Sequence, residues 1–369
     1  MSRQGYLIAF LFFAVCGVVR AQWEMENSGT TADLRGIDNV GGGVAWASGT
    51  NGTVLRTEDG GYLWQACAIP PGAEHLDFRG VQAFDANTAI VMSSGKGDLS
   101  RLYKTADGCH TWKLVFTNPD KDGFWDGVQF PDQRTGWVLG DPTHGRFRLW
   151  KTNTGGNQWE LDSGSDSLKA DPKSAGVFAA SNSSLGLCPP LSDYPVFGSG
   201  GTSGAFFYRI YEVTVCFDCR GQQKHHWQRV ITPIEGGAES AGIFSISMRD
   251  AFRGVVVGGN YLKPDEAEKT AAFSNDQGKT WTAAQTPPHG YRSAVAYDAA
   301  SKTWITVGPN GTDISTDDGK NWRAVHPDPA MHEAPDADRD WNALSLPFVV
   351  GPHGRIGKLN PKALAKESK

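Results

Sequence analysis

A short motif that recurs along this chain limits what the chain can fold into. The segment RTEDGGYLW at 56–64 returns in related form at 104–112, 151–159, 274–281 and 315–322. We expect a further, degraded copy around Asp218, Gly221 and Trp227. With that copy included, successive motifs lie roughly 40 to 65 residues apart, which is typical of propeller blades with loops of variable length. The repeat therefore predicts a series of similar small sheets.

The consensus S/T-x-D-x-G-x-T-W resembles the Asp-box of BNR-repeat proteins. Its aspartate is expected to accept backbone N–H groups of a tight turn, its glycine to adopt a positive φ, and its tryptophan to pack between sheets. A calcium loop needs 6–8 oxygen ligands, and each copy offers too few. We predict neither a metal site nor a cofactor. The predicted structural residues are Asp59, Trp64, Asp107, Trp112, Trp159, Asp276, Trp281, Asp317 and Trp322.

A second repeat of short apolar runs precedes each motif and predicts the inner strands. The predicted strand starts are 35–37, 79–81, 126–128, 175–177, 241–243, 292–294 and 341–346. These starts predict an all-β fold, a seven-bladed β-propeller with four strands in each blade. The last blade lacks a fourth strand, and residues 23–26 resemble one. We therefore expect the N-terminal strand to close the ring and to remove its free edges.

The first residues predict export. Arg3 precedes an apolar run at 6–19, and Ala21 fits a signal-peptidase site. We expect a signal peptide at 1–21, cleavage after Ala21, a single domain at 22–369, and a secreted or periplasmic location. The apolar run is too short to span a membrane comfortably, and no later segment is as long.

Charge and cysteine content narrow the function classes. A formal net charge of −5 gives no electrostatic footprint for nucleic acid. Five cysteines follow the predicted signal peptide, so at most two disulfides can form within the chain. Cys216 and Cys219 are predicted to bond locally, or one of them to bond Cys188. The pairing among Cys67, Cys109, Cys188, Cys216 and Cys219 otherwise stays open.

The segments 48–61 (SGTNGTVLRTEDGG) and 307–322 (VGPNGTDISTDDGKNW), with the RGI and RGV strand starts, resemble photosystem II stability/assembly-factor-like proteins of the BNR/sialidase-like propeller group. The resemblance covers essentially the whole mature chain. It implies a propeller that acts as an assembly scaffold and binds protein partners. The shared residues are those that build blades, so the resemblance implies no particular partner.

Strand order predicts where a site would lie. If the motif turns occupy one rim, the inner-strand starts and the loops between second and third strands surround the channel mouth at the other. The predicted ligand- or partner-binding residues there are Arg35, Arg79, Trp125, Asp126, Asp141, Asn260, Tyr261, Arg292 and Trp341. Converging guanidinium groups favour an anionic partner. Alternatively, the arginines pair with Asp126, Asp141 and backbone carbonyls and plug the channel.

These observations predict a monomeric, non-catalytic scaffold that binds a protein or an anionic or glycan ligand at the channel mouth. The alternative is a glycan-binding protein or a sialidase-like glycoside hydrolase. Sialidases need an arginine triad, a Tyr/Glu nucleophile pair and an Asp acid/base. The segment 147–150 (FRLW) matches their FRIP motif only in part and lies elsewhere in the chain, so we predict no catalytic residues.

Overall fold

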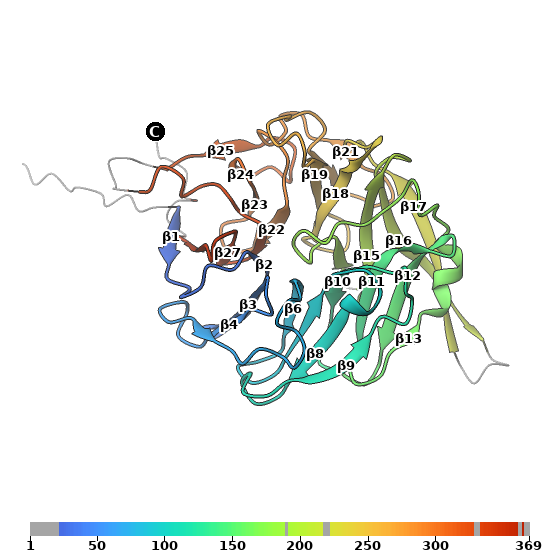
Figure 1. Cartoon of the computed structure of the whole chain (residues 1–369). Coiled ribbons are helices and arrows are strands. Elements are labelled where there is room, and N and C mark those ends of the chain that lie inside the picture. The colour runs from blue at the N-terminus through green and yellow to red at the C-terminus, as the bar shows by residue number, and fades with distance from the viewer. Residues whose placement is uncertain (1–21, 189–190, 217–221, 328–332, 361–363, 365–369) are drawn as a thin grey trace, which may run out of the picture.

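The computed structural model describes residues 22–188, 191–216, 222–327, 333–360 and 364 (Figure 1). The predicted signal peptide at 1–21 lies outside these ranges, as do Asp218, Cys219 and Gly221. The degraded repeat and the Cys219 disulfide therefore stay predictions. The helical turns with defined bounds in the described ranges are η1 (Gly97–Leu99) and η2 (Ser163–Ser167). No helix in these ranges is long and apolar enough to cross a membrane.

The strands follow one another in groups of four, called sets 1 to 7 here. Set 1 contains β2 (Leu34–Gly41), β3 (Val44–Gly49), β4 (Val54–Thr57) and β5 (Gln65–Ala66). Set 2 contains β6 (Phe78–Ala83), β7 (Ala89–Ser93), β8 (Arg101–Thr105) and β9 (Lys113–Thr117). Set 3 contains β10 (Trp125–Gln129), β11 (Gly136–Thr143), β12 (Arg146–Thr152) and β13 (Glu160–Leu161). Set 4 contains β14 (Leu185–Cys188), β15 (Leu191–Gly201), β16 (Phe206–Cys216) and β17 (Gln222–Ile231).

The remaining sets continue the pattern. Set 5 contains β18 (Ala238–Met248), β19 (Gly254–Asn260), β20 (Ala271–Ser274) and β21 (Thr282–Ala283). Set 6 contains β22 (Ala294–Asp298), β23 (Thr303–Gly308), β24 (Gly311–Ser315) and β25 (Arg323–Val325). Set 7 contains β26 (Ala343–Ser345), β27 (Phe348–Val350), β28 (Ile356–Leu359) and, from the start of the chain, β1 (Trp23–Glu26).

The sets succeed each other around a ring in chain order, as Figure 1 shows. Sets 4 and 5 also hydrogen bond to each other, because β15 pairs with β18 at Gly200–Gly242 and Gly201–Ala238. The fold is an all-β propeller, as the repeat predicts. Since sets 4 and 5 share one sheet, the count of seven blades stays a prediction.

The N-terminal strand closes the ring, as predicted. β1 pairs antiparallel with β28, with Trp23 opposite Leu359 and Glu26 opposite Ile356. Trp23 is buried, and its Nε1 donates to Thr312 Oγ1 of set 6 at 3.1 Å. The first strand is thus held by a backbone ladder to set 7 and by a side chain to set 6.

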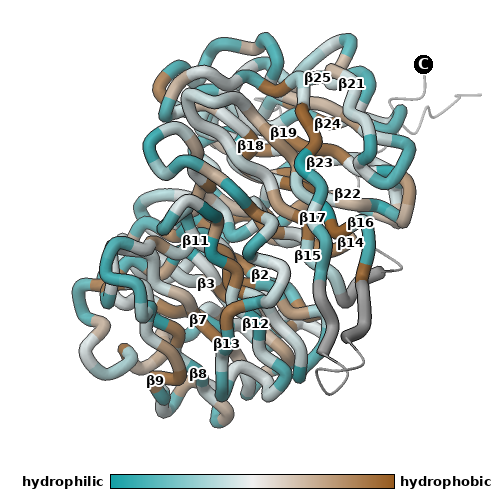
Figure 2. The backbone as a smooth tube through the Cα atoms, turned by 90° about the vertical axis from the view of Figure 1, so that its right-hand side faces the viewer, coloured by the Kyte–Doolittle hydropathy of each residue, from teal (hydrophilic) through white to brown (hydrophobic). Residues whose placement is uncertain are grey.

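Large aromatic side chains pack the spaces between neighbouring sets. The ring of Trp64 lies 5.4 Å from that of Phe348 across sets 1 and 7, and Trp112 lies 6.4 Å from Trp46 across sets 2 and 1. Hydrophobic residues lie mostly along the strands and hydrophilic ones on the loops (Figure 2). Burial of apolar area between sheets therefore holds adjacent sets together.

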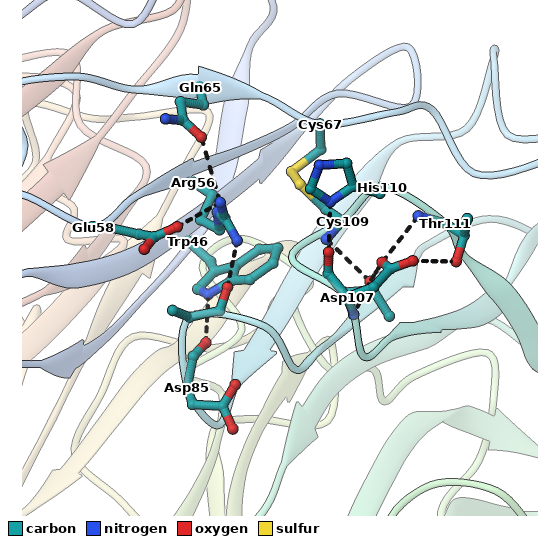
Figure 3. Close-up of a disulfide and its surroundings, with 12 residues drawn as sticks. Trp46, Arg56, Glu58, Gln65, Cys67, Asp85, Asp107, Cys109, His110 and Thr111 are labelled. Atoms are coloured by element: carbon teal, nitrogen blue, oxygen red, sulfur yellow. Dashed lines mark hydrogen bonds and ion pairs between the residues drawn. A yellow bond between two sulfur atoms is a disulfide. The ribbon is translucent and has the colours of Figure 1, made fainter.

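The repeated motif forms the turn between the third and fourth strands. In set 2, Asp107 Oδ1 accepts the Thr111 N–H at 3.0 Å, and Thr105 Oγ1 accepts the Cys109 N–H at 3.1 Å (Figure 3). In set 3, where threonine replaces the aspartate, Thr154 Oγ1 accepts the Gln158 N–H at 2.9 Å. Both side chains satisfy backbone donors that the turn leaves without a strand partner.

A disulfide joins sets 1 and 2. Cys67 follows β5, and Cys109 lies in the motif turn of set 2, 42 residues further along the chain (Figure 3). The sequence leaves this pairing open. The bond links two neighbouring sheets at their outer strands, close to the Asp107 turn.

The predicted inner strand of the fourth repeat is misplaced. Residues 175–177 form no strand, and Gly176 makes only an isolated bridge to Gly200. The inner strand of set 4 is β14, which begins at Leu185. The segment before it takes another course, through the centre of the ring.

Candidate functional site

The centre of the ring is occupied by the chain's own residues 181–183. Asn182 Oδ1 accepts the Val128 N–H at 2.8 Å, and its Nδ2 donates to the Val128 carbonyl at 3.0 Å. Ser181 Oγ donates to the Ser293 carbonyl at 2.8 Å, and Ser183 Oγ lies 2.7 Å from Ser245 Oγ. These contacts reach the inner strands of sets 3 and 5 and the approach to β22 of set 6. The segment 181–183 therefore closes the channel.

A cavity of about 540 Å³ lies at one mouth of the ring, against this segment. Ala179 and Ala180, just before the closing segment, line it together with Ser293. The volume falls within the range of about 300–1,000 Å³ that is usual for ligand pockets. The cavity is thus large enough to hold a small ligand or a short peptide segment.

One position of the inner strands supplies much of the lining. The β2–β3 ladder pairs Leu34 and Gly36 with successive residues of β3 and skips Arg35, and such a β-bulge redirects the skipped side chain. The same irregularity occurs at the start of β6 and β10 and within β18. The corresponding residues, Arg35, Arg79, Asp126 and Phe244, all line the cavity.

Arg35 and Arg79 share one carboxylate. Arg79 Nε donates to Asp77 Oδ2 at 2.7 Å, and its Nη1 donates to the Ala179 carbonyl at 3.3 Å. Arg35 lies farther from its partners, with Nε 3.7 Å from Asp77 Oδ1 and Nη2 3.9 Å from Asp33 Oδ2. In the described part of the chain, the buried Arg35 Nε has no hydrogen-bond partner. Arg79 is thus engaged internally, whereas the partly exposed Nη groups of Arg35 keep donor capacity toward the cavity.

Two carboxyl groups face the same space. Burial and the neighbouring Asp141 carboxyl raise the pKa of Asp126 well above its ordinary value, and Arg79 offsets this only in part. Burial raises the pKa of Asp141 to about 6, against a hydrogen bond from the Val177 N–H at 2.8 Å. Protonation of these groups reduces the negative charge beside the arginines.

Aromatic rings form a second wall of the cavity. Phe178 and Phe244 stack with centroids 3.8 Å apart, and Tyr291 meets Phe244 edge-on at 4.7 Å. Tyr261 completes the wall with its ring 6.1 Å from Phe244, and its side chain is half exposed. The cavity therefore combines a charged wall from sets 1 to 3 with an aromatic wall from the set 4 approach and sets 5 and 6.

The structure brings together six of the nine predicted mouth residues. The predicted residues that line the cavity are Arg35, Arg79, Asp126, Asp141, Tyr261 and Trp341. Trp125 instead lies in the core, stacked on Phe116 with centroids 5.1 Å apart. Asn260 is buried and uses Oδ1 to accept the Leu262 N–H at 3.0 Å.

The sequence predicts Arg292 at the mouth, and the structure corrects this. The side chain is fully buried and does not line the cavity. Its Nε and Nη2 both donate to Asp313 Oδ2, and its Nη1 donates to the Tyr291 carbonyl at 2.7 Å. The reason is the register of β22. Ala294 pairs with its neighbouring strand as Gly36 does in set 1. Ser293, the residue before Ala294, is therefore the counterpart of Arg35.

Three aromatic residues of the wall were missed. Phe244 occupies the bulge position of set 5. Aligning the repeats on Ser245 and Ile246 places Phe244 at this position, but the predicted strand start at 241–243 does not. Tyr291 directly precedes a predicted strand start and offered a weak signal. Phe178 comes from a segment without repeat equivalents, and no sequence pattern indicates its position.

The arrangement suits binding. Guanidinium donors can hold a carboxylate, and the rings can hold an apolar side chain. Among the described residues, no group of three or more His, Cys, Asp or Glu side chains is placed to hold a metal ion. Fold and cavity together define the class: a β-propeller with a ligand-sized cavity at its channel mouth.

Two solved structures share this architecture. A structure of YCF48 bound to a D1 peptide superposes with a TM-score of 0.61 at 16% identity, covering 92% of this chain and 96% of that chain. YCF48 from Cyanidioschyzon merolae also gives 0.61, at 18% identity, covering 93% and 100%. No protein-family model matches the sequence, and no curated protein matches it. At these identities, the likeness shows the fold.

Proposed function

We propose that this chain is an exported, non-catalytic propeller that binds a segment of a protein partner in the mouth cavity. The bound segment presents a carboxylate to Arg35. The propeller positions the site, and Ala179 and Ala180, which precede the closing segment 181–183, line the cavity. Binding then requires no passage through the ring.

The incomplete pairing of Arg35 carries this proposal. Its two carboxylate neighbours lie at 3.7 and 3.9 Å, beyond hydrogen-bond distance, and its buried Nε has no hydrogen-bond partner among the described residues. The Nε faces the equally buried Asp77 Oδ1, so a ligand has to be held by the other guanidinium nitrogens of Arg35, whose side chain is 27% exposed. A ligand carboxylate in the cavity would accept charge-assisted hydrogen bonds from these nitrogens.

The fold neighbours support a peptide as the ligand. One of the two YCF48 structures is of that propeller bound to a D1 peptide. A cavity of about 540 Å³ admits a short piece of a chain and not a folded domain. The partner thus inserts a loop or a terminus into the mouth.

Arg35→Gln tests the proposal. The test uses arrayed peptides of random sequence, made in matched versions with Asp or Asn at the central position. The mature chain is titrated into each peptide, and binding is followed by fluorescence anisotropy. We expect Arg35→Gln to weaken binding of the Asp peptides about ten- to a hundredfold, the equivalent of one charge-assisted contact. The free energy of unfolding should change by less than about 0.5 kcal/mol, because the native pairs of Arg35 are long.

Two variants serve as controls. Arg35→Lys keeps the positive charge but loses the planar guanidinium group that can bind a carboxylate through two hydrogen bonds, and it should retain part of the affinity. Arg323→Gln removes an exposed arginine from β25, the outer strand of set 6, and should leave binding unchanged. Equal affinity of Arg35→Gln and the wild type for the Asp peptides would overturn the proposal.

A further inference from the structure

The charged and aromatic walls enclose one cavity, which Arg35 and Tyr291 both line. Burial raises the pKa of the Tyr291 hydroxyl, and the positive charge of Arg35 acts in the opposite direction. The Tyr291 ring in turn contacts Phe244 edge-on at 4.7 Å. A ligand group held by Arg35 is therefore beside an aromatic surface.

The aromatic wall is rigid where it faces the cavity. Phe244 is 2% exposed, and Phe178 stacks on it. The Phe178 ring also lies against the backbone of Gly200 and Gly242, where an added Cβ would approach Phe178 Cε2 to 2.6 and 2.8 Å. Because these rings are fixed before a ligand arrives, little side-chain entropy is lost on binding.

The rim of the aromatic wall carries the opposite charge to the arginine end. Glu239 lines the cavity on β18, and the Tyr261 N–H donates to the carbonyl of the adjacent Ser240 at 3.2 Å. A second carboxylate near Tyr261 would be repelled by Glu239. An apolar side chain has no such cost and covers the exposed part of the Tyr261 ring.

We propose that the cavity recognises a two-part determinant: a carboxylate for Arg35, next to one large apolar side chain for the wall of Phe178, Phe244 and Tyr261. This inference rests on the proposed function and adds selectivity to it. Peptides with acidic runs alone bind less well than peptides with a single carboxylate beside a Phe or Leu. The carboxylate belongs either to an acidic side chain or to a chain terminus.

Matched peptide pools test this selectivity. One pool has Phe-Asp fixed between randomised flanks, and others replace Phe by Ala or Asp by Asn. A further pair ends in Phe with a free or an amidated C-terminus. With the mature wild-type chain, we expect Phe→Ala and Asp→Asn each to weaken binding about tenfold or more. The terminal pair shows which source of carboxylate is preferred.

Two protein variants locate the apolar contact. Tyr261→Ala should make binding nearly insensitive to Phe→Ala in the peptide while keeping the Asp dependence. Tyr62→Ala is the control, since Tyr62 is 88% exposed and lies in a motif turn between β4 and β5; it should behave as wild type. Arg35→Gln should remove the Asp dependence and keep the Phe dependence.

The outcomes separate the two proposals. Binding that depends on Asp but not on Phe overturns the two-part determinant and leaves the proposed function standing. A Phe dependence that is unchanged in Tyr261→Ala also overturns it. Binding that depends on neither residue, or no binding of any pool, overturns both proposals.

Discussion

Sets 1 and 6 place opposite kinds of side chain at equivalent positions. In set 1, Leu34 and Leu55 are buried in one apolar cluster. In set 6, the matching positions hold Arg292 and Asp313, which are equally buried and form an ion pair. The backbone supports the match, because the N–H groups of Leu34 and Arg292 each donate to a carbonyl of the preceding set. Leu55 and Asp313 each lie four residues before the aspartate of their motif.

This comparison separates two arginines that look alike in the sequence. Arg292 takes the place of a core leucine, so it needs Asp313 as a buried partner. Arg35 lies one position further along the register, at a bulge, and faces the cavity with long ion pairs. A shift of one residue thus turns a structural arginine into a candidate binding residue.

The largest effect is expected from breaking the pair in set 6. Arg292→Leu removes the buried cationic partner of Asp313, which keeps only the hydrogen bond from His289, and should lower the free energy of unfolding by about 3–5 kcal/mol. The double variant Arg292→Leu with Asp313→Leu recreates the apolar pair of set 1 and should recover most of this loss. Urea unfolding measures both. A double variant as unstable as the single one would show that the two positions are not equivalent.

The motif turns also offer a pair of equivalent positions with different side chains, and the expected effect is smaller. Asp107→Ala removes the acceptor of the Thr111 N–H and should cost about 1–3 kcal/mol of unfolding free energy, with peptide affinity of the folded protein unchanged. Thr154→Asp, where threonine already performs this role, is the matched control and should change stability by less than about 0.5 kcal/mol. If affinity falls in Asp107→Ala while stability does not, the turn has a binding role.

The smallest expected effect concerns pH. The cavity around Arg35 and the buried pair of Arg292 and Asp313 should lose their contributions to binding or stability in different pH ranges. Burial raises the pKa of Asp141 to about 6, so the stability that its protonated form contributes is lost as the pH rises through that value. The same ionisation adds negative charge to the cavity. Affinity for an acidic peptide should be several-fold weaker at about pH 7.5 than at about pH 5.5, and Asp141→Asn should reduce the difference, which Asp126, whose pKa is also raised, accounts for in part.

The Asp313 carboxylate of the ion pair in set 6 should lose its contribution to stability only in acid. Burial by itself raises the pKa of Asp313, but the hydrogen bond from His289 and the charge of Arg292 outweigh it and hold the pKa below its ordinary value. Its contribution to stability is therefore present above the unfolded pKa and is lost as the pH falls through the lower, folded value. A loss of this contribution near pH 6 would contradict the assignment.

The sequence predicts the fold well because each copy of the motif carries its own turn chemistry and its own packing tryptophan. Ring closure is also predictable, since an incomplete last set and a leading strand complement each other. The site is less predictable. Bulges fix which residue faces the cavity. The sequence pattern starts the inner strand of set 6 one residue too early, so it predicts Arg292 at the mouth, although Ser293 is the counterpart of Arg35. The closing segment and Phe178 have no repeat equivalents, so their places depend on tertiary contacts alone.

The pairing of β1 with β28 has a consequence for how the chain acquires its structure. Glu24 and Asn360, 336 residues apart in sequence, are hydrogen bonded at 3.4 Å. During synthesis, β1, the outer strand of set 7, emerges before the other strands described here, and its partner β28 emerges after them. Closing a loop of this length is slow, and until it closes, the facing surfaces of sets 1, 6 and 7 stay exposed to water. The unclosed ring is then the species most exposed to aggregation, so chaperones that hold the chain should act before this single late step.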